Sequence, residues 1–462
     1  MKTILLYFIF FSTIIFAQDG SRDTSFNIGS GANGNVYLIR QLSDGKILIG
    51  GQFTTYDGAP ANQLARLNSN GTLDTTFSSG LGISGLLISD AIEDNGKIII
   101  VGEFGSYHGI PRNSIARLNM DGSLDNSFDP GSGAMNIEKI LKQDDKFLVT
   151  GLFQTYDGNN SRSIARINSD GSFDETFLAL GTEPSFNVAI SDAIIQPDGK
   201  IFVVGNFSTI NGVVRNKVAR LNADGSLDLT FDPHIGPSSD ILSACVQADG
   251  KYFISGLFSQ FDGNPANLIA RINPDGSYDS SFVPGAGYGI AATTLLIQPD
   301  QKIISGGWLT TAGGNGKYLL RLLSNGSVDD TFNPDAMGPD NTINTLSFQS
   351  DGKILAGGWF SSVNGTEQNR ITRLNNNISL STVDFSTEYK IYPNPVKDIL
   401  VVEQSNFSAA ELEIADATGK ILFATSINSS LHSIDMSSFS AGVYIIKLKM
   451  GTRASNMKII KL

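Results

Sequence analysis

The sequence predicts an all-β protein: a seven-bladed β-propeller closed by its N-terminal strand, followed by a small Ig-like β-sandwich. Three observations predict this fold. A unit of about 50 residues recurs seven times between residues 19 and 377, each copy offers about four short β-runs separated by Gly, Asn and Asp turns, and alternating β-runs of another kind follow residue 377. This period with four strands per unit is typical of a propeller blade. The alternative, an open β-solenoid, usually has shorter rungs.

The first 17 residues predict a secretory signal peptide. Lys2 precedes an apolar run that ends at Ala17, a small residue that suits cleavage. A transmembrane anchor is the alternative, but the run is short for a bilayer. No later stretch is long and apolar enough to span one, so we expect a mature chain without a transmembrane segment.

The repeat is easiest to follow from the lysine of a D-G-K turn or its variants. Each lysine is followed by an apolar run ending in Gly-x-aromatic or a near match, such as "ILIGGQF", then by a turn, then by "ARLN" or a relative, then by D-G-S-x-D-x-x-F. The steps between the lysines are 51, 49, 54, 51, 51 and 51 residues, for Lys46, Lys97, Lys146, Lys200, Lys251, Lys302 and Lys353.

The two ends of the repeat region complement each other. The seventh copy stops at "ITRLNNN", residues 371–377, and lacks its own D-G-S-x-D-x-x-F stretch, whereas "DGSRDTSF", residues 19–26, has nothing before it except the leader. A closed ring removes exposed strand edges. We therefore expect residues 22–26 to run antiparallel to residues 371–375 and to complete the last blade.

A repeated Arg–Asp pair makes this closure specific. In six copies the Arg of "ARLN" precedes the Asp of D-G-S-x-D by eight residues, and the seventh pair is Arg373 with Asp23. Phe26 then takes the place that Phe77 has one blade on. We expect structural ion pairs or arginine–backbone bonds here, because a binding site rarely needs seven copies. A functional ring of arginines is the alternative.

The unit resembles the delta-60 repeat, a β-propeller repeat of bacterial surface and secreted proteins. The resemblance covers roughly residues 19–377 through the pattern "DGKIL…GGxF…ARLNxDGSLDxxF". It implies the propeller fold, and it brings no assigned activity.

The chain beyond the repeat predicts a linker and a second domain. Residues 378–388 are polar and rich in Ser and Thr. Residues 389–462 carry eight Lys and Arg against six Asp and Glu, and their alternating runs predict a small antiparallel sandwich.

Three landmarks mark this second domain: "YPNPVKDIL", "DATGKIL" and "SAGVYIIKL", followed by a final strand with "KIIKL". In this order they resemble the type A C-terminal sorting domain of the type IX (Por) secretion system. The resemblance implies Sec export, passage through the outer membrane by secretion machinery that recognises residues 389–462, and a secreted or surface-attached product. As turn and strand-end residues, Pro393, Pro395, Gly419 and Gly442 also have a purely structural interpretation. The motif residues are Pro393, Asn394, Pro395, Asp416, Gly419, Lys420, Gly442, Tyr444 and Lys458.

Composition excludes several function classes. A formal net charge of −12 argues against nucleic-acid binding, and a single cysteine allows no intramolecular disulfide. No His/Cys cluster has metal-ligand spacing. Strings such as "NSDGSFD" resemble a calcium loop but fit an Asp-Gly hairpin turn better. No catalytic motif is recognisable, and we expect a monomer with no cofactor, no metal and no enzymatic activity.

The two tryptophans, Trp308 and Trp359, are the candidate ligand-binding residues. Both fill the variable x of "GGxF/L", in consecutive blades, where they could form a platform for sugar rings or an aromatic peptide. Packing between the blades is the alternative. The sequence thus favours a secreted or surface binding propeller with a glycan or protein ligand. An extracellular polysaccharide-active enzyme and a purely structural surface component are the alternatives.

Overall fold

The computed structural model describes residues 18–78, 80–178, 189–284, 292–310, 316–332, 338–376, 389–404, 410–416, 421–427, 429, 431–440, 442–450 and 453–462. The chain forms two compact units, Met1–Asn377 and Ile378–Leu462. All regular elements of the described residues are β-strands. None of these residues belongs to a helix long and apolar enough to cross a membrane.

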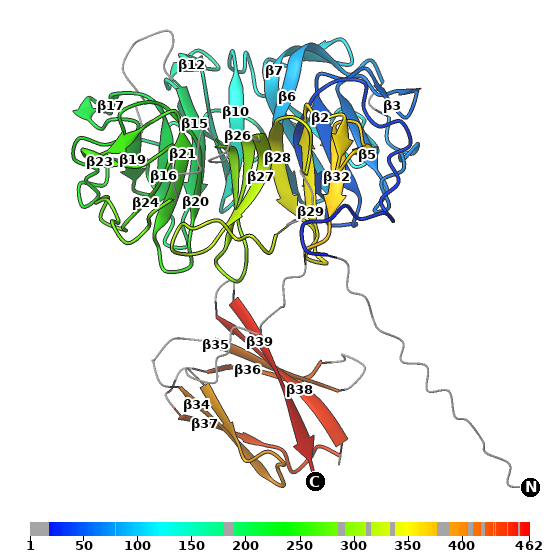
Figure 1. Ribbon diagram of the computed structural model, residues 1–462, viewed down its shortest axis with the longest axis vertical. Helices are drawn as coiled ribbons and strands as arrows, with labels where there is room; N and C mark the ends of the chain where they lie inside the picture. The colour runs from blue at the N-terminus through cyan, green and yellow to red at the C-terminus, as the bar shows by residue number, and fades with distance from the viewer. Residues whose placement is uncertain are drawn as a thin grey trace, which may run out of the picture. The chain divides into compact units, whose positions relative to one another are not determined.

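The first unit is a seven-bladed propeller, which confirms the predicted fold class (Figure 1). Each blade is an antiparallel sheet whose first strand lies innermost, and these strands follow one another around the ring. The inner strands are β1 (Val36–Gln41), β6 (Ile83–Asp94), β10 (Ile137–Gln143), β15 (Ala189–Ile195), β20 (Ile241–Val246), β25 (Ala292–Ile297) and β28 (Ile343–Phe348).

The apolar runs after each lysine form the central strands, and the "ARLN" segments form the next strands outward. The central strands are β2 (Ile47–Gly51), β7 (Lys97–Tyr107), β11 (Lys146–Gly151), β16 (Ile201–Asn206), β21 (Tyr252–Gly256), β26 (Ile303–Thr310) and β29 (Ile354–Gly358). The outer strands are β5 (Leu64–Leu67), β9 (Ile115–Asn119), β14 (Ile164–Ile167), β19 (Val218–Leu221), β24 (Ile269–Ile272), β27 (Gly316–Leu322) and β32 (Ile371–Leu374).

Short hairpins lie between the central and outer strands. They are β3 (Thr55–Tyr56) with β4 (Ala59–Pro60), β12 (Thr155–Tyr156) with β13 (Asn159–Asn160), β17 (Thr209–Ile210) with β18 (Val213–Val214), β22 (Gln260–Phe261) with β23 (Asn264–Pro265), and β30 (Ser362–Val363) with β31 (Thr366–Glu367); β8 (Ile110–Pro111) pairs with the end of β7.

The hydrophobic core is divided into seven clusters, each between two neighbouring blades. Leu48 of blade 1 packs with Ile98 and Ile100 of blade 2, and the cluster between blades 7 and 1 joins Leu355 to Val36. The central strands are buried on both faces, so each blade depends on its two neighbours for its core.

The fourth run of each blade is shorter than the repeat predicts. Only one residue of it makes a β-bridge, as Leu73 does with Leu67. The side chain of the following Asp74 then accepts a hydrogen bond from the backbone N–H of Thr76 at 3.1 Å, and the Phe77 N–H bonds to the Asp74 carbonyl at 3.2 Å. This Asx turn leads the chain away from the sheet, so the run ends there.

The ring closes through the N-terminal segment, drawn in dark blue beside yellow β32 in Figure 1. Arg22 bridges Leu374 in antiparallel orientation, and the Asp23 N–H bonds to the Arg373 carbonyl at 2.8 Å. The pairing joins residues 20–23 to residues 373–375. The prediction paired residues 22–26 with residues 371–375; the observed pairing instead starts at residue 20 and ends at Asp23, because Asp23 starts the same Asx turn that ends the fourth run elsewhere.

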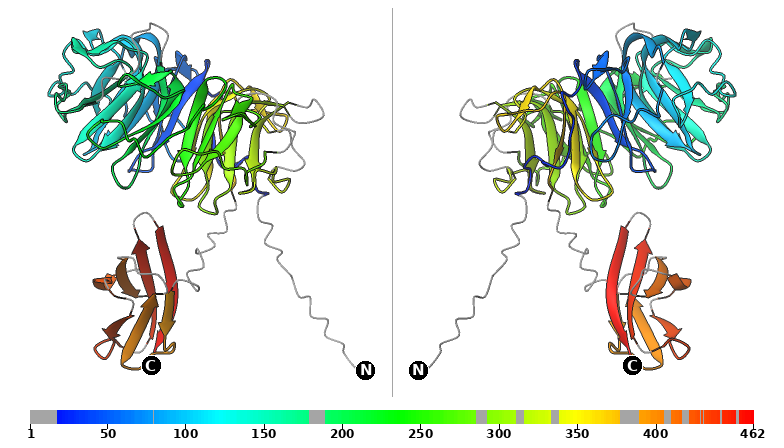
Figure 2. Two further views of the ribbon diagram at one scale, coloured as in Figure 1. Left: turned by 90° about the vertical axis from the view of Figure 1, so that its left-hand side faces the viewer. Right: turned by 90° about the vertical axis from the view of Figure 1, so that its right-hand side faces the viewer.

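The second unit is a sandwich of two antiparallel sheets around one core. One sheet contains β33 (Tyr389–Tyr392), β34 (Ile399–Gln404) and β37 (Leu431–Asp435); the other contains β36 (Ile421–Ile427), β35 (Ala410–Asp416), β38 (Gly442–Met450) and β39 (Arg453–Lys461). Leu400 and Val402 from the first sheet pack with Leu412 and Ile446 from the second. Figure 2 shows the two layers, with red β38 and β39 in one and orange β34 in the other.

Candidate functional site

The repeated Arg–Asp pairs hold neighbouring blades together. The Arg66 Nε lies 2.7 Å from Asp74 Oδ2, and its guanidinium carbon lies 5.0 Å from the ring centroid of Phe77. Arg66 also donates to the Met120 carbonyl of blade 2. Burial opposes ionisation of Asp74, but hydrogen bonds from Lys46, Thr76 and Arg66 outweigh it and hold the pKa of this carboxyl well below its usual range. The charged groups of Arg66 and Asp74 are thus engaged by contacts within the propeller, which is the structural role expected for this pair.

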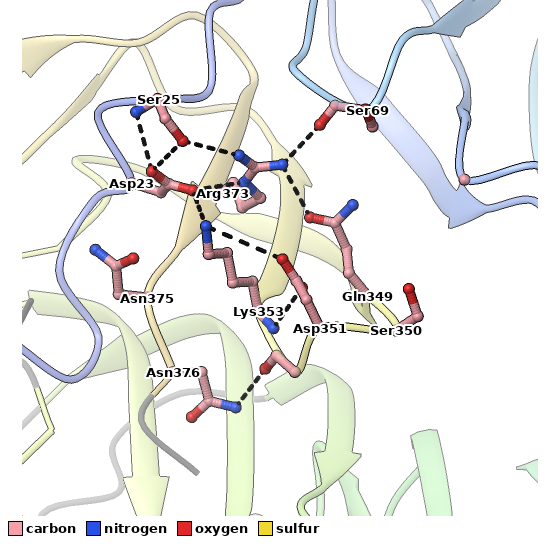
Figure 3. A network of polar contacts seen from close by, with 12 residues as sticks. Asp23, Ser25, Ser69, Gln349, Ser350, Asp351, Lys353, Arg373, Asn375 and Asn376 are labelled. Atoms are coloured by element: carbon pink, nitrogen blue, oxygen red, sulfur yellow. Dashed lines mark hydrogen bonds and ion pairs between the residues drawn. The ribbon is translucent and has the colours of Figure 1, made fainter. Parts of the chain in front are cut away.

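The closing blade has the same contacts, made by residues from both chain ends (Figure 3). The Arg373 Nε lies 2.8 Å from Asp23 Oδ2, its guanidinium carbon lies 4.7 Å from the Phe26 ring, and Lys353 Nζ lies 2.7 Å from the same Asp23 oxygen. Arg373 also donates to the Ser69 carbonyl of blade 1 at 2.7 Å. The structure therefore brings Asp23, Phe26 and Arg373 together.

Several of the sorting-motif residues lie in loops or at strand ends of the second unit. The exposed loop at Pro393–Pro395 holds the last strand: Asn394 Oδ1 accepts a hydrogen bond from the Ile460 N–H at 2.9 Å, and the Val396 N–H donates to the Ile460 carbonyl at 2.8 Å. Gly442 begins β38, and the buried Tyr444 in this strand donates to the Ser440 carbonyl at 2.8 Å.

The other motif residues are less closely grouped. Asp416 ends β35, where it pairs in register with Tyr444, and Lys458 lies in β39 opposite Ile445. Gly419 and Lys420 fall outside the described residues, as do the predicted signal peptide and linker.

Trp308 and Trp359 are exposed to 56% and 46%, so they are not packed between blades 6 and 7. They occupy what we call the rim position, the x of "GGxF". In blade 1 this residue is Gln52, whose side chain lies 3.4 Å from the Tyr37 hydroxyl, and in blade 2 it is Glu103. Tyr37 and Glu103 both line a central channel, so in blades 1 and 2 the rim position lies at its mouth, and the repeat puts Trp308 and Trp359 at the equivalent place of blades 6 and 7.

The central channel has a volume of about 760 Å³ and is lined by the seven inner strands. In each inner strand a β-bulge is followed by a residue that we call the channel position, paired in register with the central strand. The channel positions are Leu38, Asp90, Lys139, Asp192, Ser243, Thr294 and Thr345. The residue type on the wall thus varies among the blades, although the scaffold repeats.

Charged residues gather on the wall of blades 1–4. Arg40 lies 3.1 Å from Asp90, and Lys139 lies 3.2 Å from Asp192. The Asp192 carboxylate is the main cause of a raised pKa at Lys139, which keeps this amine charged. Blades 5–7 carry hydroxyl groups instead.

Two acidic residues that line the channel, Glu138 and, at the mouth, Glu103, have no such partner among the described residues. Burial, and then the charge on Asp192, raises the pKa of Glu138 to about 7. No ion pair or hydrogen bond engages its carboxyl group among the residues that the structure describes. Within the same residues, no group of three or more His, Cys, Asp or Glu side chains is arranged to hold a metal ion.

No motif in the sequence points to the channel residues. A partial signal existed, because charged residues stand seven or eight positions before the D-G-K lysine in blades 2–4 (Asp90, Lys139 and Asp192), whereas the other blades have Leu, Ser or Thr eight positions before it. Its meaning depended on knowing that these positions face one channel.

Matches to known domains cover both units. The DUF5122 β-propeller, a domain of unknown function, matches residues 42–77, 93–128, 142–177, 196–231, 247–282, 298–332 and 349–380. The secretion system C-terminal sorting domain matches residues 390–462. These matches confirm the predicted repeat region and sorting domain.

Solved structures show weaker likeness. PorZ, a surface component of the type IX secretion system of Porphyromonas gingivalis, is 14% identical with a TM-score of 0.43, over 94% of this chain and 60% of PorZ. This chain therefore spans about three fifths of that protein. A gluconolactonase from Xanthomonas campestris is 11% identical with a TM-score of 0.37, over 74% of this chain and 96% of the enzyme. Likeness at this level says nothing about ligand or activity, and no curated protein matches the sequence.

Proposed function

Because this chain belongs to the DUF5122 β-propeller family and ends in a secretion system C-terminal sorting domain, we propose that its propeller is a non-enzymatic binding module for a glycan or protein ligand. The sorting domain directs type IX secretion to the cell surface or beyond, through interaction with the secretion machinery. The propeller is the cargo, so its function belongs outside the cell.

The observation that carries this proposal is the contrast between a repeated scaffold and an unrepeated channel. The Arg–Asp contacts recur in seven blades, whereas the channel position is occupied by five residue types, Leu, Asp, Lys, Ser and Thr, and the rim position also varies among the blades. Residues that vary on a constant scaffold are where binding specificity can be placed without loss of the fold. Concave sites with a few placed polar groups are the usual binding sites of proteins.

Both ends of the propeller's chain lie at the D-G-K end of blade 7. Asn376 donates to the Gly352 carbonyl at 2.9 Å, in the D-G-K turn of blade 7, and Gly20 bonds to Asn375. Trp359 follows the opposite end of β29 from that turn. Within the propeller, both chain ends therefore lie at the end remote from the tryptophans.

The two tryptophans also provide the test, because they are the only ones in the chain. Any change in intrinsic tryptophan fluorescence reports on the rim. We expect binding on a glycan or protein array to be accompanied by such a change, and to be lost in Trp308→Ala and Trp359→Ala variants. Leu229→Ala, an exposed apolar residue in the D-G-S-x-D turn at the other end of its blade, is the matched control. An empty array and unchanged fluorescence would instead favour a structural surface component.

A polysaccharide-active enzyme is the second candidate, favoured by Glu138. A carboxyl group with a pKa of about 7 beside the carboxylate of Asp192 is the kind of pair that general acid catalysis uses. Activity screening on soluble polysaccharides separates the two functions. An enzyme requires turnover that Glu138→Gln abolishes, whereas a binding module shows none.

A further inference from the structure

Some hydrogen-bonding groups of the channel wall have no partner within the fold, and Glu138 is the clearest case. In four other blades the equivalent residue, which is the bulge residue before the channel position, bonds through its side chain to a carbonyl of the next blade. The contacts are Ser89 to Ile137 at 2.9 Å, Ser191 to Ile241 at 2.7 Å, Thr293 to Ile343 at 2.6 Å and Asn344 to Val36 at 3.1 Å. Blade 3 has Glu138 at this place, and its carboxyl group makes no such bond among the described residues.

Two hydroxyl groups are unused in the same way. Thr294 and Thr345 line the channel, and neither hydroxyl has a hydrogen-bond partner in the described part of the chain. In a ring of seven blades, blades 6 and 7 lie opposite blade 3. Glu138 therefore stands across the channel from Thr294 and Thr345, and these three groups can reach one ligand between them.

The charges of the channel favour a neutral ligand. The carboxylates of Asp90 and Asp192 are already engaged by Arg40 at 3.1 Å and by Lys139 at 3.2 Å. An anionic ligand would have to replace one of these pairs or face the free carboxyls of Glu138 and Glu103, and leaving a charge unpaired in a confined site is costly. A neutral ligand needs neither change. Among the described lining residues, the free groups are the carboxyls of Glu138 and Glu103, the amide of Asn136 and the hydroxyls of Thr294 and Thr345, and all of them can bond to hydroxyl groups of a ligand.

The two rim tryptophans lie near the two threonines in strand register. Thr294 pairs with Gly306 and Thr345 with Gly357, and Trp308 and Trp359 follow these glycines by two residues. Two residues of a strand extend about 7 Å. An exposed indole face packs well against a flat surface of C–H groups, and its N–H stays free for a polar contact.

We infer that the channel and its rim bind the end of a neutral oligosaccharide, with a sugar ring stacked on Trp308 or Trp359 and sugar hydroxyls bonded to Glu138, Thr294 and Thr345. A pyranose combines an apolar ring face with a rim of hydroxyl groups, as this arrangement requires. The inference rests on the proposed binding function and names the ligand class and the contact residues for it.

The inference includes a pH dependence. A carboxylate accepts stronger hydrogen bonds from sugar hydroxyls than a protonated carboxyl does. Because the pKa of Glu138 is about 7, we expect binding to be about fivefold tighter at pH 8 than at pH 6. The charged groups that face Glu138 in the channel are Asp192, Asp90, Lys139, Arg40 and, at the mouth, Glu103.

The experiment titrates the full secreted chain with cellotetraose, laminaritetraose, mannotetraose and xylotetraose, each to about 1 mM, and follows tryptophan fluorescence at pH 6 and pH 8. Tetragalacturonate and the tetramer of glucosamine serve as anionic and cationic probes. We expect at least one neutral probe to bind and the charged ones to bind less well. Thr294→Val and Thr345→Val should each weaken binding several-fold, and Glu138→Gln should remove the pH dependence. Glu175→Gln, at an exposed carboxylate in the D-G-S-x-D turn of blade 3, should change neither.

The outcomes separate the inference from the proposed function. Binding of a charged probe or a protein that depends on the tryptophans, without binding of any neutral probe, overturns the inference and leaves the proposed function intact. Neutral binding that is unaffected in all three channel variants also overturns it, since the sugar then lies elsewhere. Failure of every probe, together with an empty glycan and protein array, overturns both. Thermal unfolding of each variant shows whether it is folded.

Discussion

The contact between Asp23 and Arg373 can be tested by a double-mutant cycle, because it joins residues 350 positions apart (Figure 3). The perturbations are Asp23→Ala, Arg373→Ala and the pair. Both side chains are buried, each with 8% exposure, and 2.8 Å separates Arg373 Nε from Asp23 Oδ2. Removing one partner of such a pair costs about 3–5 kcal/mol, because the other charge stays buried. Here Lys353, 2.7 Å from Asp23, reduces the cost of losing Arg373.

The expected coupling free energy between the two positions is about 1–3 kcal/mol. The assay is urea denaturation of the four proteins, with the free energy of unfolding as the measured quantity. The matched control is Arg166 with Asp174, which makes the same contact at 2.6 Å inside one hairpin of blade 3. Its coupling persists in an open chain, since the two residues are eight positions apart in sequence. Coupling at positions 166 and 174 without coupling at positions 23 and 373 would refute the closed ring.

The same contact predicts a pH dependence. Burial opposes ionisation of Asp23, but hydrogen bonds from Lys353 and Ser25 and the charge on Arg373 outweigh it, so the pKa of this carboxyl is lowered in the folded state. A lowered pKa gives stability that is present above the ordinary aspartate pKa of about 4 and is lost as the pH falls below it. The Asp23→Ala protein should therefore lose less stability than the wild type on acidification. An equal loss in both proteins would contradict this.

Three further predictions concern the chain ends and the channel. Deleting residues 19–27 should lower the free energy of unfolding by much more than the ~1 kcal/mol typical of a surface substitution, and it should cause aggregation, because blade 7 loses its outer segment. A soluble deletion protein with unchanged stability would contradict this prediction. Glu138→Gln should stabilise the propeller at pH 8 by up to about 3 kcal/mol and leave its stability unchanged near pH 4. The reason is that the raised pKa of Glu138 gives the wild type stability at low pH that is lost as the pH rises through about 7. Thermal unfolding of both proteins at both pH values measures the difference. Deleting residues 389–462 should leave a folded propeller in the periplasm, as cell fractionation can show; normal amounts of the truncated protein at the surface would argue against the role of the sorting domain.

The propeller could be predicted from the sequence alone, because comparison of the seven copies shows which segments make up a complete blade. The seventh copy lacks a segment that the other six have, and residues 19–26 supply it, so Asp23 could be assigned to Arg373 without coordinates. The C-terminal landmarks worked in the same way, since their order along the chain identifies the sorting domain. What the repeat could not show was the extent of the pairing. The hydrogen bonds of the Asp23 side chain to Ser25 end it early, and this depends on local geometry.

The channel was decided by the tertiary structure. Arg40 and Asp90 lie 50 residues apart in sequence, and Glu138 and Thr345 lie more than 200 apart, yet all four line one cavity. Each of these residues sits in an ordinary β-run before a D-G-K turn, where its neighbours in sequence give no sign of a common wall. They meet because radial packing of the blades brings the first strand of every copy to the axis. The exposure of Trp308 and Trp359 was decided in the same way, since the sequence defines a variable position and only the closed ring places that position at the mouth of the channel.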